Sequence, residues 1–62
     1  MSDDLNMSMR KFLKQVGVTS QQAIETAIRE NGKPGNAYKV KAVVTIEELG
    51  LTHEINGEIK GE

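Results

Sequence analysis

The sequence has 62 residues, a net charge of −1 at pH 7 and no cysteine, so it describes one small domain without disulfides or thiolate metal sites. A domain of this size buries only about 60% of the surface that its unfolded chain exposes, so its core is small. No apolar run approaches the roughly 18 residues of a membrane-spanning helix, and no hydrophobic signal segment follows the first methionine. We therefore expect a cytoplasmic protein with no membrane span.

Charge is divided unevenly along the chain. Residues 1–41 contain seven Lys or Arg and four Asp or Glu, whereas residues 42–62 contain one Lys and five Glu. Such a division can indicate an anionic partner for the basic part. No run of five like charges occurs, which favours the simpler interpretation that the two parts neutralise each other within the fold or across a dimer.

The first predicted element is a helix over about residues 4–16. Its apolar residues recur at the spacing of one helix face, and they are Leu5, Met9, Phe12, Leu13 and Val16. Asp3 or Asp4 can cap its start, with Asn6 as a later candidate. Gly17 follows the last apolar position, where a helix commonly ends in a left-handed residue. These signals predict a helix that stops at Gly17.

A second helix is predicted over about residues 20–31. Thr19 and Gln22 have the spacing of a capping box, and Asn31 is followed by glycine, as at many helix ends. The apolar positions of this segment are Ala23, Ile24, Ala27 and Ile28. Because only the two-residue link Gly17-Val18 lies between the first helix and the cap of the second, we expect the helices to be adjacent, at a steep or antiparallel angle.

Beyond a loop at residues 32–36, the hydrophobic period changes to two. This alternation predicts strands over about residues 38–46 and 51–59, joined by a turn at 47–50 that ends in glycine. A four-residue turn sets the register, because a one-residue slip would send every side chain of one strand to the wrong face.

In that register one face of the predicted hairpin is nearly all apolar and the other nearly all polar, as a hairpin covered on one side requires. The apolar face pairs Ile46 with Leu51, Val44 with His53, Ala42 with Ile55, Val40 with Gly57 and Tyr38 with Ile59. The polar face pairs Thr45 with Thr52, Val43 with Glu54, Lys41 with Asn56 and Lys39 with Glu58.

The pair Asn56-Gly57 is itself a hairpin-turn signal, which leaves a third strand as an alternative. A turn at that point would put Ile55 and Ile59 on opposite faces of the sheet. We therefore expect one continuous strand with a glycine bulge or kink.

The predicted fold class is α+β with the order ααββ, two N-terminal helices packed on one face of a C-terminal antiparallel β-hairpin within a single domain, residues 1–62. A two-stranded sheet is marginal and has two unpaired edges. Pairing of the first strand with a second copy, centred on Ala42, would make a four-stranded sheet without opposing like charges. We therefore predict a homodimer whose edge contains Tyr38, Val40, Ala42, Val43 and Val44.

Residues suited to catalysis or to metal binding are sparse. The chain has one His and no Cys, and Glu47 and Glu48 are neighbours in an exposed turn. Catalysis usually requires a nucleophile beside a base, paired carboxylates or a metal cluster. The glycines and lysine of loop 32–36 lack the spacing of a phosphate-binding loop. We therefore expect no enzymatic activity, no cofactor and no metal site.

His53 is the one titratable residue expected on the apolar face of the sheet. It is a candidate pH-sensitive residue or metal ligand. With no second His and no Cys, a metal site would need Glu54 or a partner chain to complete it. We therefore favour a partly buried histidine that bonds to a backbone carbonyl or a hydroxyl.

Nucleic-acid binding is the alternative function. The string LKQVGVTSQQAIETAI, residues 13–28, resembles the turn of a helix-turn-helix, and the hairpin after it would make a winged-helix-like protein. Leu13 and Thr26 depart from that motif, and Glu47-Glu48 at the wing tip would repel phosphate. The basic residues available for anion binding are Arg10, Lys14, Lys33, Lys39 and Lys41. We therefore favour a small, non-catalytic interaction or assembly domain that acts as a homodimer, with an unidentified protein partner.

Two stretches show a family resemblance, NMSMRKFLKQVGVTSQQAIE at residues 6–25 and TIEELGLTHEINGEI at residues 45–59. They resemble a family of short, uncharacterised bacterial proteins, mainly from proteobacteria. The resemblance covers nearly the whole chain and implies a small domain of unknown function. It implies no activity and supplies no site residues.

Overall fold

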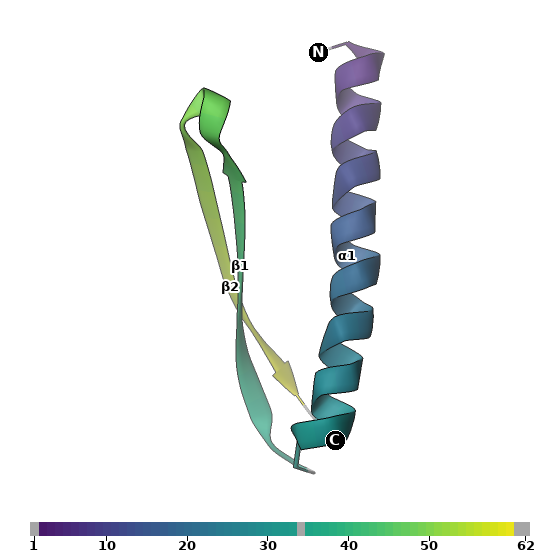
Figure 1. Cartoon of the computed structure of the whole chain (residues 1–62), viewed down its shortest axis with the longest axis vertical. Helices are drawn as coiled ribbons and strands as arrows, with labels where there is room; N and C mark the ends of the chain where they lie inside the picture. The colour runs from purple at the N-terminus through teal and green to yellow at the C-terminus, as the bar shows by residue number, and fades with distance from the viewer. Residues whose placement is uncertain (1, 34, 61–62) are drawn as a thin grey trace. The chain divides into compact units, whose positions relative to one another are not determined.

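A computed structural model describes residues 2–33 and 35–60 of the chain. It contains one helix followed by an antiparallel β-hairpin, so the α+β class is confirmed (Figure 1). The elements are α1 (Asp3–Asn31), β1 (Ala37–Ile46), the 3-10 turn η1 (Glu47–Leu49) and β2 (Leu51–Lys60). The chain divides into two compact units, of which the first ends at Asn31 and the second begins at Gly32.

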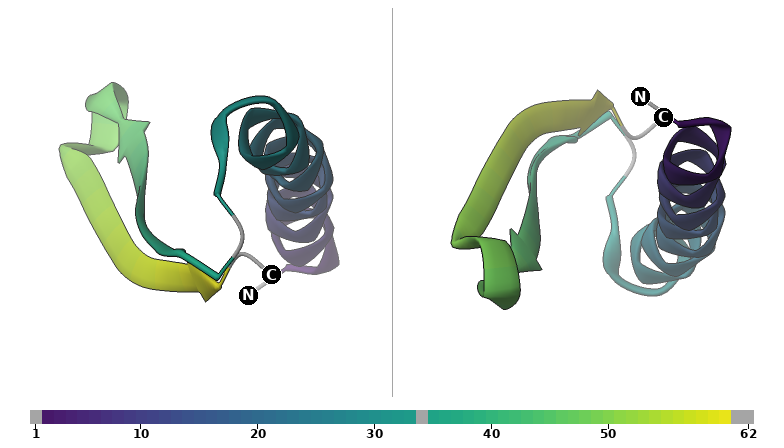
Figure 2. Two further views of the ribbon diagram at one scale, coloured as in Figure 1. Left: turned by 90° about the horizontal axis from the view of Figure 1, so that it is seen from below. Right: turned by 90° about the horizontal axis from the view of Figure 1, so that it is seen from above.

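The first unit is one continuous helix of 29 residues, so the prediction of two helices over 4–16 and 20–31 is wrong. Figure 2 shows α1 end-on as an unbroken coil. The apolar positions before and after Gly17 are in phase, because Val16 and Ala23 are seven residues apart, close to two helical turns. Among the described residues, positive φ occurs only at Gly35 and Gly50, so Gly17 is an interior helical residue.

The threonines of α1 bond back to their own helix. The Thr19 hydroxyl donates to the Gln15 carbonyl oxygen at 2.8 Å, and the Thr26 hydroxyl donates to that of Gln22 at 3.0 Å. This pattern is open to a threonine in a helix interior, where its hydroxyl reaches the carbonyl one turn earlier. Thr19 is therefore not the N-cap of a second helix.

Ser2 caps the start of α1. The Leu5 backbone N–H donates to Ser2 Oγ at 3.2 Å, and the Asn6 N–H donates to the Ser2 carbonyl at 3.1 Å. The predicted caps Asp3 and Asp4 lie instead in the first turn. Their negative charges interact favourably there with the positive end of the helix dipole.

The hairpin has the predicted register along its whole length. Ile46 pairs with Leu51, and the ladder continues to Ala37 opposite Lys60. The strands are one residue longer at the open end than predicted. Because alternate residues point to opposite faces, this register places the apolar residues of both strands on one face.

The turn is closed by a left-handed glycine. Gly50 has φ 63° and ψ 25°, and its N–H donates to the Glu47 carbonyl at 3.1 Å. Residues with a Cβ rarely adopt this conformation, because the Cβ approaches a backbone oxygen. The position of Gly50 at the end of the turn therefore brings Ile46 opposite Leu51.

β2 runs through Asn56-Gly57 without a turn, as preferred from the sequence. The expected glycine bulge is absent, because every residue of described β2 has a single partner in β1. Gly57 lies opposite Val40, and a Cβ on Gly57 would meet Val40 Cγ1 at 3.6 Å, an ordinary contact distance. The ladder hydrogen bonds and the apolar residues on either side of the glycine favour the straight pairing.

The packing of the helical unit on the apolar face of the hairpin stays a prediction, as do the single domain and the four-stranded dimer. None of the described residues is buried. The half-buried ones outside the loop are Val16, Ile24, Ile28, Tyr38, Val40, Val44 and Ile59.

Gly17→Ala tests the continuity of α1. An added Cβ meets nothing within 4 Å outside the backbone of its own helix, and alanine favours a helix interior over glycine. We expect the free energy of unfolding to rise by about 0.5–1 kcal/mol, measured by urea denaturation followed by circular dichroism. A loss of stability would instead indicate a helix that ends at Gly17.

Gly50→Ala tests the turn. The left-handed conformation costs a non-glycine residue about 1–2 kcal/mol. The free energy of unfolding is therefore expected to fall by that amount, seen as a lower urea midpoint. Gly57→Ala is the matched control, since it adds the same methyl group to the hairpin without strain or clash. Equal losses in the two variants at one protein concentration would contradict this account of the register.

Candidate interaction surface

The predicted dimer edge lies on β1. Tyr38, Val40 and Val44 are half-buried, whereas Ala42 and Val43 are exposed. The sheet formed by the described residues has two strands, so β1 has one edge without a strand partner in that part of the chain. Unpaired edges present backbone N–H and C=O groups that can bond to another strand.

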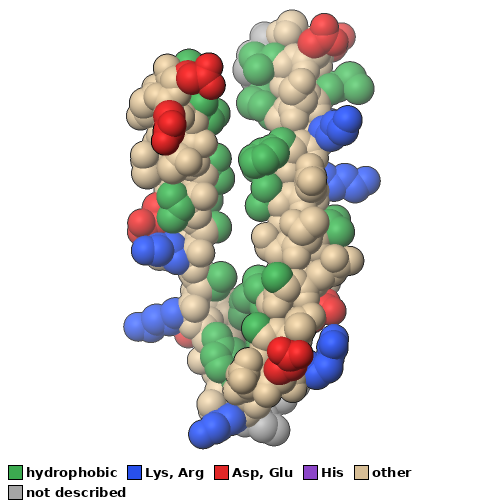
Figure 3. All heavy atoms as spheres, viewed as in Figure 1, with side chains coloured by type: hydrophobic (Ala, Val, Ile, Leu, Met, Phe, Trp, Pro, Cys, Tyr) green, Lys and Arg blue, Asp and Glu red, His purple; other side chains and the backbone are tan. Residues whose placement is uncertain are grey.

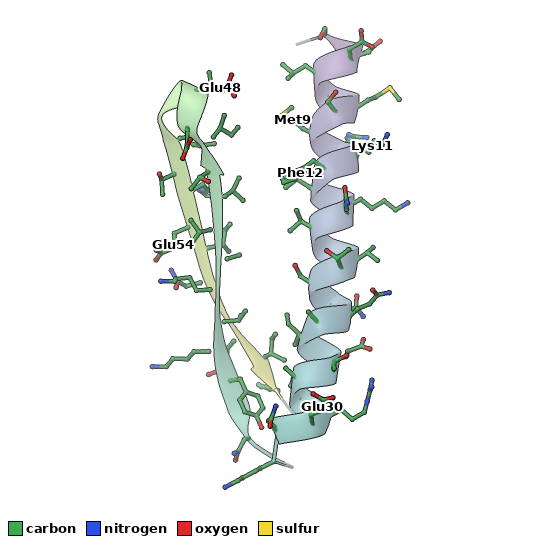
Figure 4. All side chains as sticks on the ribbon, viewed as in Figure 1. Met9, Lys11, Phe12, Glu30, Glu48 and Glu54 are labelled. Carbon is green, nitrogen blue, oxygen red and sulfur yellow. The ribbon has the colours of Figure 1, made fainter. Side chains whose placement is uncertain are left out.

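The two faces of the hairpin differ in chemistry. Figure 3 shows hydrophobic side chains along one side of the hairpin and charged side chains along the other. On the charged face Lys39 lies opposite Glu58, and Lys41 lies opposite Asn56. The Asn56 amide donates to Glu54 Oε2 at 3.1 Å, and Figure 4 shows Glu54 on this face. The charged face of β2 is thus acidic and that of β1 basic.

Val43 is the exception on the charged face. It lies between Lys41 and Thr45 in β1, faces Glu54 of β2, and is 50% exposed. Its neighbours Ala42 and Val44 belong to the apolar face, so the middle of β1 is apolar on both faces. A strand that is apolar on both faces is typical of a strand that is covered on both faces.

The helix has an apolar stripe of its own. Its large members Leu5, Met9, Phe12 and Leu13 lie in the N-terminal half and are 40–55% exposed. In the C-terminal half the stripe has the small residues Ala23 and Ala27 between half-buried isoleucines. Figure 4 shows Met9 and Phe12 projecting from one side of α1 and Lys11 from another.

The five basic residues of the predicted anion patch are exposed, but they come from both units. Arg10 and Lys14 lie on α1, Lys33 lies in the loop, and Lys39 and Lys41 lie on β1. A common exposed face for all five therefore stays a prediction.

The helix-turn-helix resemblance fails in the structure. The residues that would form its turn, Gly17 to Thr19, lie inside α1. Without a turn there is no separate recognition helix to present to a nucleic-acid groove. The winged-helix architecture is therefore wrong for this chain.

His53 lies opposite Val44 on the apolar face of the hairpin, near the turn. It is exposed, not partly buried as expected. The described residues contain no group of three or more His, Cys, Asp or Glu side chains that could hold a metal ion. The structure thus gives His53 no metal-binding partners within the described chain.

The Tyr38 hydroxyl closes the loop before β1, a contact that the sequence patterns did not predict. The Lys33 backbone N–H donates to the Tyr38 hydroxyl at 2.7 Å, and that hydroxyl donates to the Lys33 carbonyl at 3.3 Å. The Asn36 N–H also donates to the Lys33 carbonyl, at 3.2 Å. These bonds anchor the loop to the start of β1.

No helix in the described part of the chain is long and apolar enough to cross a membrane. The chain matches a family model described as a family of unknown function (DUF6494), over residues 1–62. No curated protein and no solved structure matches the chain significantly.

Tyr38→Phe tests the loop contact. It removes both hydroxyl bonds but keeps the ring on the apolar face. We expect a loss of about 0.5–1.5 kcal/mol in unfolding free energy, together with faster hydrogen exchange at the Lys33 amide. Unchanged exchange at Lys33 would show that the hydroxyl does not anchor the loop.

Proposed function

We propose that this chain, which belongs to the family of unknown function DUF6494, is a non-catalytic interaction module that acts as a homodimer through the free edge of β1. The absence of catalytic activity belongs to the proposal. The bacterial origin and the cytoplasmic location expected from the sequence stay predictions.

The exposure of large apolar side chains is the observation on which this proposal rests. Large apolar side chains on both elements are 40–76% exposed, from Met9 on the helix to Leu49 at the hairpin tip. An amphipathic helix draws most of its stability from packing, and a two-stranded hairpin is marginal by itself. A second copy supplies apolar area to both elements and extends the sheet to four strands.

β1 is the better of the two edges for this purpose. Its central residues Ala42, Val43 and Val44 are small or β-branched, and β-branched residues favour strands. The corresponding stretch of β2 contains Glu54, and its further course contains Gly57 and Glu58. Charged residues on an edge strand oppose pairing with another chain. In β1 the charged residues are Lys39 and Lys41, and residues 42–46 carry no charge, whereas Glu54 interrupts the middle of β2. The β1 edge therefore favours pairing with a second copy more than the β2 edge does.

Nucleic-acid binding is not part of this proposal. The continuous helix lacks the turn that suggested it, and Glu47 and Glu48 lie at the hairpin tip, where the wing would approach phosphate. Salt-dependent retention on a heparin column would reopen that alternative.

Sedimentation equilibrium across a range of concentrations tests the proposal. We expect a mass that rises from near 6.8 kDa towards twice that value, and a midpoint of thermal unfolding that rises with protein concentration. A mass near 6.8 kDa at every concentration, with a constant midpoint, would rule out the homodimer.

A further inference from the structure

We propose that two copies join their β1 edges antiparallel in the register centred on Val43, so that Val43 lies against Val43 of the second copy. This inference rests on the proposed homodimer and specifies its contact. It differs from the Ala42-centred pairing expected from the sequence, because the structure leaves Val43 half exposed on the charged face.

The faces of the hairpin restrict the register first. Opposed residues of antiparallel strands point to the same side of the sheet. A dimer sheet that keeps one continuous apolar face must therefore centre on a residue and not on the gap between two residues. This condition limits the dimer to a short series of registers along β1.

Charge restricts it further. A centre at Lys39 or Lys41 opposes each lysine to its own copy, and a centre at Val40 opposes Lys39 to Lys41. Like charges directly opposite are destabilising. Only centres at Ala42, at Val43 or nearer the turn are left, and the overlap of the two strands shrinks as the centre moves towards the turn.

The exposed Val43 side chain decides between the remaining registers. The Ala42 centre places Val43 against Lys41 of the second copy, and the Val44 centre places it against Thr45. Only the Val43 centre pairs this half-exposed valine with another apolar side chain. It thereby covers the one large apolar residue on the charged face of β1.

The other pairs of the Val43 register are also complementary. On the apolar face Val40 lies against Ile46 of the second copy and Ala42 against Val44. On the charged face Lys41 lies against Thr45 of the second copy, and Lys39 comes opposite Glu47, the first residue of η1 after the end of β1. The two-fold symmetry repeats each pair, so two lysine–glutamate contacts flank the central valines.

Single-cysteine variants measure the register directly, since the natural chain has no cysteine. A disulfide requires Cα atoms within about 7 Å. V43C is expected to form a covalent dimer under mild oxidation at least tenfold faster than K41C, its control on the same face. In the proposed register two residues at position 41 are about 13 Å apart along the strands.

Charge reversal gives a second, independent measurement. E47K would oppose Lys39 of the second copy, so we expect dimer dissociation constants about three- to tenfold higher. E48K is the matched control, because it changes the charge by the same amount one residue away, opposite Tyr38. The double variant K39E/E47K is expected to regain affinity relative to E47K.

The outcomes separate the register from the proposed function. If the natural chain is monomeric at every concentration, both fail. If it is a dimer in which A42C links fastest, the Val43 register is wrong and the homodimer stands. If F12C links instead, the contact lies on the helix stripe, and the pairing of β1 edges is overturned.

Discussion

The pairing of Ile46 with Leu51 is the constraint on which the hairpin depends. Gly50, in its left-handed conformation, closes a turn of a length that permits this pairing. From that point the alternation of strand residues assigns every other side chain to a face. The same register that gathers the apolar residues also leaves Val43 on the charged face, and the proposed dimer register is centred on this residue.

The helix has a different periodicity from the strands, but it too gathers its apolar residues on one face. Its apolar positions on either side of Gly17 stay on one face only when the helix is continuous, because a break would separate them. Continuing a helix through a glycine costs roughly 1 kcal/mol relative to alanine. Packing of the in-phase stripe from Leu5 to Ile28 offsets that cost. A turn in the helix would divide the stripe, and this packing energy would be lost.

The small size of the chain is one of the reasons for the proposed homodimer. Its helix has large apolar residues that are half exposed, and its sheet has two strands. Backbone hydrogen bonds along the edge of β1 and apolar contacts on both of its faces are obtained together when two such edges meet. The uneven division of charge has a counterpart in the proposed dimer, in which basic β1 would meet the acidic turn of the second copy.

The sequence by itself determined the strands, their register, the turn and the apolar face of the hairpin, because a slip of one residue would reverse every side chain from Tyr38 to Ile59. It also determined the apolar positions of the helix. Only the tertiary structure decided that α1 continues through Gly17, that Ser2 caps it, that Gly57 needs no bulge and that Tyr38 anchors Lys33. Glycine and threonine suit both an end and an interior of a helix, with free energies that differ by about 1 kcal/mol. Differences that small are settled by the phase of the whole stripe and by contacts between residues, not by any one residue's preference.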